Sequence, residues 1–299
     1  MLTRQAIQTG AYRQQFEAVP GLWTPERIDV SLDATLRERP AGADEVWVFG
    51  YGSLIWNPAI EFAAHRIARL EGWHRSFCLR MLAGRAGCER PGRMLALEPG
   101  GDTTGIALRL HAERLVEELR LVWIREMVLG SYRPTWATVR LNDGSQAHAI
   151  AFVADPNREQ YERDASVATV APLIAQAAGP IGSNADYLFR LQAALREHGI
   201  GDAYVDALAE AVARAPRQAA RRCLRSSPRL PLAAGLRPAA LALPATVAHR
   251  ETKKPLPPAL SPRPPTPYFG QRCGPDFARR PMGDRPQYGR DEFLISTSI

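Results

Sequence analysis

The segment that most constrains the fold is a short apolar strand that runs directly into a glycine-punctuated loop. The strand covers residues 46–49, and it is followed by Gly50, Tyr51, Gly52, Ser53 and Leu54. Glycine accepts backbone angles closed to other residues and lets a ligand approach the main chain, so consecutive N–H groups can point into one concavity. Such a loop suits a carboxylate or a phosphate. An ordinary strand-to-loop turn remains the alternative on the residues alone.

Two known glycine motifs do not fit this loop. A dinucleotide-binding fingerprint requires a third glycine where Ile55 stands. A nucleophile elbow requires glycines in place of Tyr51 and Ile55 around Ser53. We therefore predict that Ser53 is a hydrogen-bonding loop residue and not a nucleophile.

Charge and proline content divide the chain near residue 214. Residues 215–299 contain 15 Lys and Arg against 5 Asp and Glu, whereas residues 1–214 contain 23 against 26. The net charge of +7 therefore originates in the tail, and 15 of the 25 prolines also follow position 214. Without sustained periodicity, the composition predicts a disordered tail, or else an aberrant terminus, over residues 215–299. Its basic charge predicts weak polyanion binding but no specific nucleic-acid recognition.

The remaining sequence predicts a helical cover, residues 1–44, and a domain, residues 45–214. Apolar periodicity and turn signals predict strands at residues 46–49, 65–71, 75–81, 93–97 and 105–110, and a hairpin of residues 136–141 and 146–154. Helices are predicted at residues 4–16, 25–37 and 112–130, and again within 166–214. Mostly antiparallel strands with one inserted helix indicate an α+β fold built on a small mixed β-barrel.

One acid on the predicted helix 112–130 lies on its apolar face. Leu115, Leu119 and Val122 form a stripe at helical spacing, and Glu126 takes the next position in it. Burial disfavours the charged form of a carboxylate, so its pKa rises toward the range in which a general base works. Glu126 is therefore the candidate catalytic residue.

A structural role for Glu126 is the alternative on periodicity alone. In that case the carboxylate forms an ion pair with an arginine such as Arg80 or Arg109, both on predicted strands.

Several ordered segments together resemble a known family. They are residues 48–58 (VFGYGSLIWNP), 72–78 (GWHRSFC), 89–92 (ERPG), 123–132 (WIREMVLGSY), 179–188 (GPIGSNADYL) and 198–202 (HGIGD). The sequence of residues 1–214 resembles the ChaC family of glutathione-specific gamma-glutamylcyclotransferases. The resemblance implies a gamma-glutamylcyclotransferase-like barrel and a catalytic glutamate at Glu126. The chain departs from the sequence pattern typical of the family at residues 83–88 and 162–170, and both segments are expected to border the pocket.

The resemblance also implies the reaction and its partners. The free α-amine of a γ-glutamyl group attacks its own γ-carbonyl, which gives 5-oxoproline and, from glutathione, cysteinylglycine, with no cofactor and no metal. Val48 to Leu54, that is Val48, Phe49, Gly50, Tyr51, Gly52, Ser53 and Leu54, are implied to bind the substrate. Tyr161 resembles a substrate-side tyrosine of the wider superfamily, and a packing role is its alternative.

Other classes of protein are less consistent with the sequence. No apolar run approaches the roughly 20 residues of a membrane span. The four cysteines form no CxxC pair and have no histidine at metal-ligand spacing, so we predict neither a zinc site nor a disulfide framework, which favours a cytoplasmic protein. Two alternatives to the glutathione enzyme remain. One is a cyclotransferase for other γ-glutamyl amino acids or amines, and the other is a non-catalytic regulatory protein that binds polyanions through its tail.

Overall fold

A closed five-stranded β-barrel forms the centre of the structure, a computed structural model that describes residues 2–226 and side chains to residue 215. The strands are β1 (Trp47–Gly50), β2 (Ala64–Met81), β3 (Gly92–Arg109), β4 (Tyr132–Leu141) and β5 (Gln146–Ala154). Their order around the barrel is β1-β3-β2-β4-β5, with β1 pairing in parallel with β5 and the other pairs antiparallel. The predicted mixed, mostly antiparallel barrel is confirmed.

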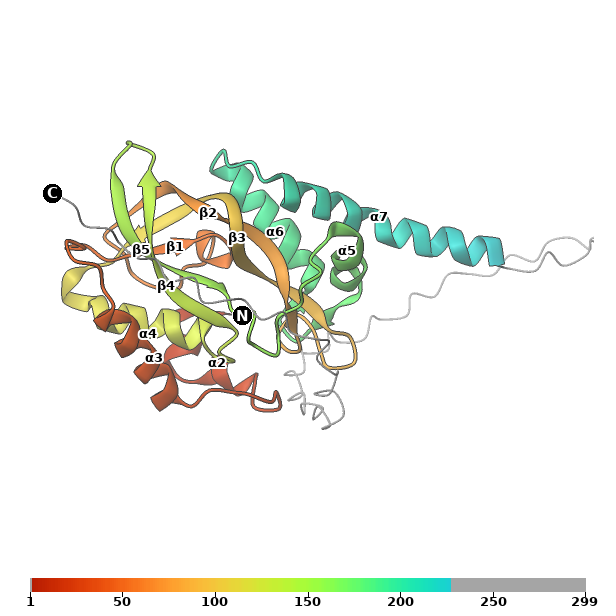
Figure 1. Ribbon diagram of the computed structural model, residues 1–299. Coiled ribbons are helices and arrows are strands. Elements are labelled where there is room, and N and C mark those ends of the chain that lie inside the picture. The colour runs from red at the N-terminus through yellow and green to blue at the C-terminus, as the bar shows by residue number, and fades with distance from the viewer. Residues whose placement is uncertain (1, 227–299) are drawn as a thin grey trace, which may run out of the picture.

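Helices lie on two sides of this barrel (Figure 1). One group consists of α1 (Arg4–Gln8), α2 (Ala11–Gln14), α3 (Pro25–Arg37) and the inserted α4 (Leu115–Glu126), which follows the 3₁₀ turn η2 (Ala112–Arg114). The other group contains α5 (Val167–Gln176), α6 (Asn184–Glu197) and α7 (Ala203–Ser226), with the short strands β6 (Ala178–Gly179) and β7 (Gly182–Ser183) between α5 and α6. A 3₁₀ turn, η1 (Ser53–Ile55), follows β1.

The long strands β2 and β3 differ from the shorter strands that we predicted. The pairs 65–71 with 75–81, and 93–97 with 105–110, each join into one strand. The register of β2 on β3 shifts between Glu71 and Trp73, around Gly72, whose φ is 80°. A glycine at positive φ bends a strand through a bulge without ending it. Gly72, which the sequence predicts as a turn between two strands, is therefore a bend within one strand.

The helix boundaries show where local signals suffice. Helix α3 has the predicted bounds, with Thr24 as N-cap accepting the Arg27 N–H. The predicted helix 4–16 is instead divided, because Gly10 has a φ of 78° and interrupts it. Helix α4 ends at Glu126, four residues before the predicted end. Helix α7 continues to Ser226, so the first residues of the predicted tail are helical, and the rest of the tail lies outside the described residues.

One sequence prediction about cysteines is wrong. Cys88 is disulfide-bonded, whereas Cys78 is free and buried. Spacing arguments detect closely spaced pairs such as CxxC, and Cys88 belongs to no such pair.

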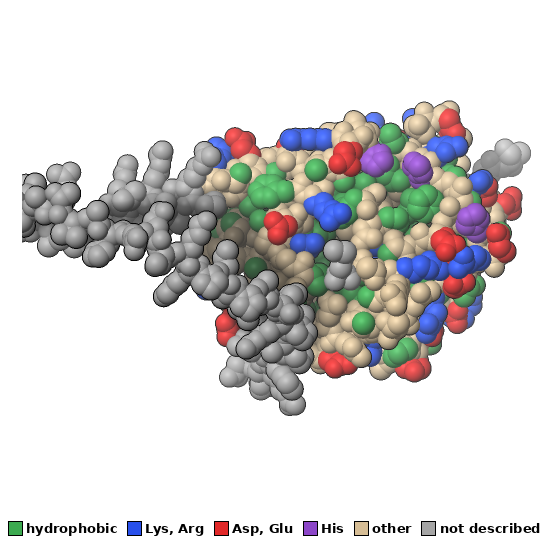
Figure 2. All heavy atoms as spheres, turned by 180° about the vertical axis from the view of Figure 1, so that it is seen from behind, with side chains coloured by type: hydrophobic (Ala, Val, Ile, Leu, Met, Phe, Trp, Pro, Cys, Tyr) green, Lys and Arg blue, Asp and Glu red, His purple; other side chains and the backbone are tan. Residues whose placement is uncertain are grey.

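The surface of the described domain agrees with its nearly balanced charge. On the face in Figure 2, basic and acidic side chains are interspersed around apolar patches. Among the described residues, none of the helices combines the length and apolar character that a membrane crossing requires.

Candidate active site

A cavity of about 510 Å³ opens beside the end of α4. The loop after β1, helix α2, strand β3 and residues 80–85 all contribute to its wall, and so does Tyr187 of α6. The N-terminal cover takes part as well, through Leu2, Tyr12 and Phe16. The cavity therefore joins segments that lie far apart in the sequence.

Glu126 lies in the wall of this cavity, as the last residue of α4. Its side chain is 16% exposed, and its Oε1 atom is 2.8 Å from Nε of Arg125. Burial raises the pKa of the Glu126 carboxyl above its ordinary value, while the charge and hydrogen bond of Arg125 oppose part of this rise. The position combines access to a ligand with a pKa shifted toward neutrality, as a general base requires.

Tyrosine side chains surround this carboxylate. Tyr12, Tyr51, Tyr132 and Tyr187 line the same cavity. Burial raises the pKa of each phenol, and the negative charge of Glu126 raises it further. These tyrosines consequently stay neutral and keep their O–H donors at the pH where Glu126 is ionised.

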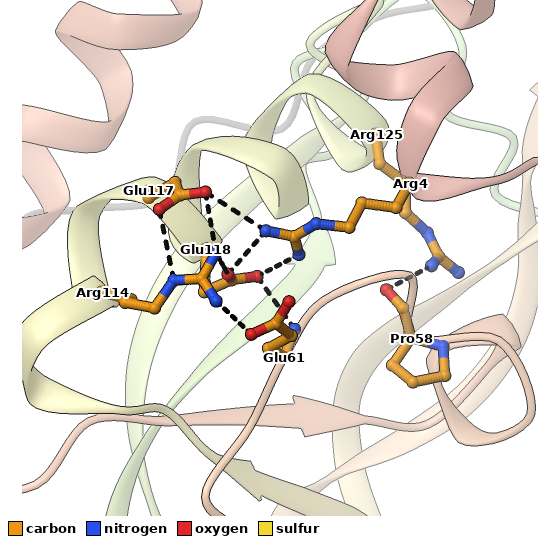
Figure 3. A network of polar contacts seen from close by, with 7 residues as sticks. All are labelled: Arg4, Pro58, Glu61, Arg114, Glu117, Glu118 and Arg125. Carbon is orange, nitrogen blue, oxygen red and sulfur yellow. Dashed lines mark hydrogen bonds and ion pairs between the residues drawn. The ribbon is translucent and has the colours of Figure 1, made fainter.

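Arg125 connects the catalytic candidate to the loop, and sequence reasoning did not identify it. Its Nη1 donates to the carbonyl oxygens of Asn57, at 2.5 Å, and Pro58, at 3.0 Å. Its Nη2 donates to Oγ of Ser53 at 2.6 Å. Figure 3 shows the side chain reaching the Pro58 carbonyl. One guanidinium group thus fixes Glu126 and the loop relative to each other, a role for which helical spacing gives no signal.

The predicted binding loop divides into a buried part and a part that faces the cavity. Val48 and Phe49 are fully buried in β1, and Gly50 pairs with Ile106 of β3. The residues of the loop that line the cavity are Tyr51, Gly52, Ser53 and Leu54. Ser53 accepts a hydrogen bond from Arg125, consistent with a loop residue and not a nucleophile.

The glycines of the loop are required for space and not for positive φ. Neither Gly50 nor Gly52 is in the left-handed region, although Gly52, at φ −129° and ψ −132°, lies outside the ordinary helical and extended regions. A Cβ on Gly50 would lie 3.0 Å from Cβ of Leu54, and one on Gly52 would lie 2.9 Å from the hydroxyl of Tyr187. Ser53 also lies near that hydroxyl, because its backbone amide and side chain lower the pKa of Tyr187 against the stronger effect of burial. The loop and Tyr187 are therefore in close contact at the cavity wall.

This contact gives a testable prediction for Gly52. The change Gly52→Ala should displace Tyr187 and lower kcat/KM for a γ-glutamyl substrate by roughly tenfold, because small displacements of a binding loop are costly to catalysis. In a Tyr187→Phe background the hydroxyl is absent, so the added methyl group should cost less. A double-mutant cycle measures the difference. If Gly52→Ala lowers kcat/KM equally in both backgrounds, the added methyl group does not act through the Tyr187 hydroxyl.

The structure does not bring Tyr161 to the cavity. Its hydroxyl donates to Oε1 of Glu98 at 2.6 Å, and its backbone forms a bridge with Leu79. The packing alternative for Tyr161 agrees with this position. The two arginines suggested as ion-pair partners of Glu126 pair elsewhere, Arg80 with Glu162 and Arg109 with Glu45, and it is Arg125 that pairs with Glu126.

Comparison with known proteins identifies the class and then the family. A gamma-glutamyl cyclotransferase specific to glutathione from yeast has a similar fold, with a TM-score of 0.52 and 22% identity over 57% of this chain and 99% of that one. The family model of ChaC-like proteins matches residues 46–215. The chain therefore belongs to the ChaC-like family, as its motifs had indicated.

Relatives of known name are also similar to the chain. The Escherichia coli K12 protein named glutathione-specific gamma-glutamylcyclotransferase is 49% identical over 206 residues, which cover 68% of this chain and 88% of the relative. A zebrafish (Danio rerio) protein named glutathione-specific gamma-glutamylcyclotransferase 1 is 31% identical over 52% of this chain and 82% of its own length. The similarity thus extends over most of each relative.

Proposed function

We propose that this protein is a glutathione-specific gamma-glutamylcyclotransferase. The observation that carries the proposal is the half-buried carboxylate of Glu126, which faces a cavity in a chain of this family. The names of the Escherichia coli and zebrafish relatives support reduced glutathione as the substrate.

The proposed reaction is an intramolecular amide cleavage. The α-nitrogen of the γ-glutamyl group forms a bond to the γ-carbonyl carbon, and the bond from that carbon to the cysteine nitrogen breaks. The α-ammonium loses two protons while the leaving nitrogen gains two, so one carboxylate that accepts a proton and then donates it serves both steps. Bond changes and protons balance without water, an oxidant or a reductant, and the products are 5-oxoproline and cysteinylglycine.

In this proposal Glu126 is the general base at the α-amine. The loop residues that line the cavity, Tyr51 to Leu54, receive the α-carboxylate of the glutamyl group through backbone N–H groups, while Val48, Phe49 and Gly50 fix the loop from β1. Holding the flexible glutamyl chain in a folded shape near the attack geometry supplies much of the rate advantage, because the step is unimolecular once the substrate is bound.

An assay of 5-oxoproline release tests the proposal. Purified protein should release 5-oxoproline from reduced glutathione and not from oxidised glutathione, since the sulfur-linked second tripeptide would have to enter the cavity wall. Gamma-glutamyl dipeptides and γ-glutamyl amines belong in the same assay. Faster release from dipeptides than from glutathione at equal concentration would favour the broader cyclotransferase, and no release from any substrate would overturn the enzyme assignment.

Two further parts of the proposal concern location and the tail. We assign the activity to the cytoplasm, where glutathione keeps thiols reduced, although the disulfide at Cys88 does not support that compartment. Weak polyanion binding by the basic tail, residues 215–299, stays a prediction, because residues 227–299 lie outside the part of the chain that the structure describes.

A further inference from the structure

Two arginines face each other across neighbouring strands in the wall of the cavity. Arg80 of β2 and Arg93 of β3 are direct partners in the register of the antiparallel pair, and both line the cavity. Like charges directly opposite on a sheet are destabilising. A pair of this kind, placed in a cavity wall, requires an explanation beyond folding.

The protein itself neutralises these arginines poorly. Among the described residues, Glu162 is the carboxylate within ion-pair range, 3.6 Å from Arg80 and 3.7 Å from Arg93, which is longer than the roughly 2.7–2.9 Å of a charge-assisted hydrogen bond. The Nε atoms of both arginines are buried without a hydrogen-bond partner among the described residues. The side chain of Arg93 is only 8% exposed, so water can supply few of the hydrogen bonds that its guanidinium group lacks. Burial lowers the pKa of Arg93; Glu162 opposes this change and Arg80 adds to it.

A third arginine extends this positive end of the cavity. Arg85 lies in the loop between β2 and β3, lines the cavity, and donates through Nη1 to the Ser183 carbonyl at 3.1 Å. It belongs to residues 83–88, where the sequence departs from the family wording, and Glu162 begins the second departing segment. Among the described side chains that line the cavity, five are arginines and one, Glu126, is an acid. The unmatched charge fits an anionic ligand.

We propose that Arg80, Arg85 and Arg93 form a subsite for a second substrate carboxylate, the C-terminal carboxylate of the peptide that leaves. This inference rests on the proposed function, in which the loop after β1 takes the first carboxylate and Glu126 the amine. A substrate whose far end is a carboxylate then supplies the missing partner for the buried Nε atoms. The subsite selects γ-glutamyl peptides with a free C-terminus over γ-glutamyl amines and over peptides with a blocked end.

The experiment compares reduced glutathione with its glycinamide, in which the C-terminal carboxylate is replaced by a carboxamide. Wild-type protein should prefer glutathione in kcat/KM by about 10- to 100-fold, as expected for charged hydrogen bonds in a buried site. The change Arg93→Met should reduce this preference to within about twofold, because the two substrates then differ only in a group that the altered site no longer distinguishes. The matched control is Arg140→Met, because Arg140 pairs with Glu71, is 58% exposed and does not line the cavity. It should keep the full preference.

A binding measurement separates failure of the subsite from failure of the proposed function. In a Glu126→Gln background, calorimetric titration should show tighter binding of glutathione than of the glycinamide, and Arg93→Met should abolish the difference. If Arg93→Met does not fold, Arg80→Met provides the same comparison. Equal affinity and equal turnover of the two ligands in wild-type protein would overturn the subsite. Absence of 5-oxoproline together with selective binding would overturn the reaction alone.

Discussion

Glu126→Gln is expected to abolish turnover of glutathione while the fold is retained. Glutamine has the shape of glutamate and can still hydrogen-bond Arg125, but it does not accept a proton at neutral pH. Loss of a positioned general base costs about 10²- to 10⁴-fold in rate. Because the change leaves the volume of the cavity unaltered, kcat should fall much more than KM changes, as single-substrate kinetics of 5-oxoproline release will show.

The matched control for this variant is Glu113→Gln. Glu113 lies in η2, directly before the same helix, but its side chain is 73% exposed and does not line the cavity. Its removal should leave kcat and KM unchanged. Near-normal turnover by a folded Glu126→Gln protein would remove Glu126 from the mechanism, and equal losses in both variants would point to a general effect on this part of the fold.

Sequence patterns predicted those parts of the fold whose signals are local. The N-cap and proline at the start of α3 and the hairpin between β4 and β5 both depend on residues close in sequence. Continuity of β2 through Gly72, by contrast, depends on pairing with β3, whose residues are about 25 positions away. From the sequence alone Gly72 predicts a turn, and only the pairing with β3 shows that the strand continues through it.

The same distinction separates the site residues that were predicted from those that were missed. Helical periodicity placed Glu126 on the buried side of α4, and the structure puts it at a cavity. Arg125 and Tyr187 contribute through contacts with the loop after β1, which lies more than 60 positions earlier in the chain. No single-helix pattern contains that information. Family likeness suggested a substrate-side position for Tyr161, and in the structure its hydroxyl donates to Glu98.

Glu118 is a second acid of α4 that periodicity misjudged. It falls near the edge of the apolar stripe, yet its side chain is 0% exposed. Its oxygens accept two hydrogen bonds from Arg4, at 2.6 and 2.8 Å, and one from the backbone N–H of Glu61 at 2.9 Å. Arg114 adds an ion pair at 3.3 Å, and Figure 3 shows these groups converging on the carboxylate. Helix α1 and the Glu61 loop create this burial, so it is absent from the α4 sequence pattern.

This network attaches the N-terminal cover to the barrel, and Glu118→Gln is expected to weaken it strongly. Removing the charge leaves Arg4 without its buried partner and should lower the free energy of unfolding by about 2–3 kcal/mol, below the full range for buried pairs because Arg4 is 24% exposed. The neighbouring Glu117→Gln is the control: Glu117 contacts the same Arg4 at 3.2 Å but is 54% exposed, so its loss should cost less than about 1 kcal/mol. Urea unfolding of the two variants gives both values.

The difference in stability between wild type and Glu118→Gln should also depend on pH. Burial alone would raise the pKa of Glu118, but the hydrogen bonds from Arg4 and Glu61 and the nearby positive charges outweigh it and lower the pKa below its ordinary value of 4.5. A depressed carboxyl pKa stabilises the folded state fully above the ordinary value, and that stabilisation is lost as the pH falls through the folded-state pKa. The difference in free energy of unfolding between wild type and Glu118→Gln should therefore become smaller at acidic pH. Leu2, Tyr12 and Phe16 of the cover line the cavity, so a loosened cover should also raise KM. Equal urea midpoints for Glu118→Gln and Glu117→Gln at neutral pH would show that apolar contacts alone hold the cover on the barrel.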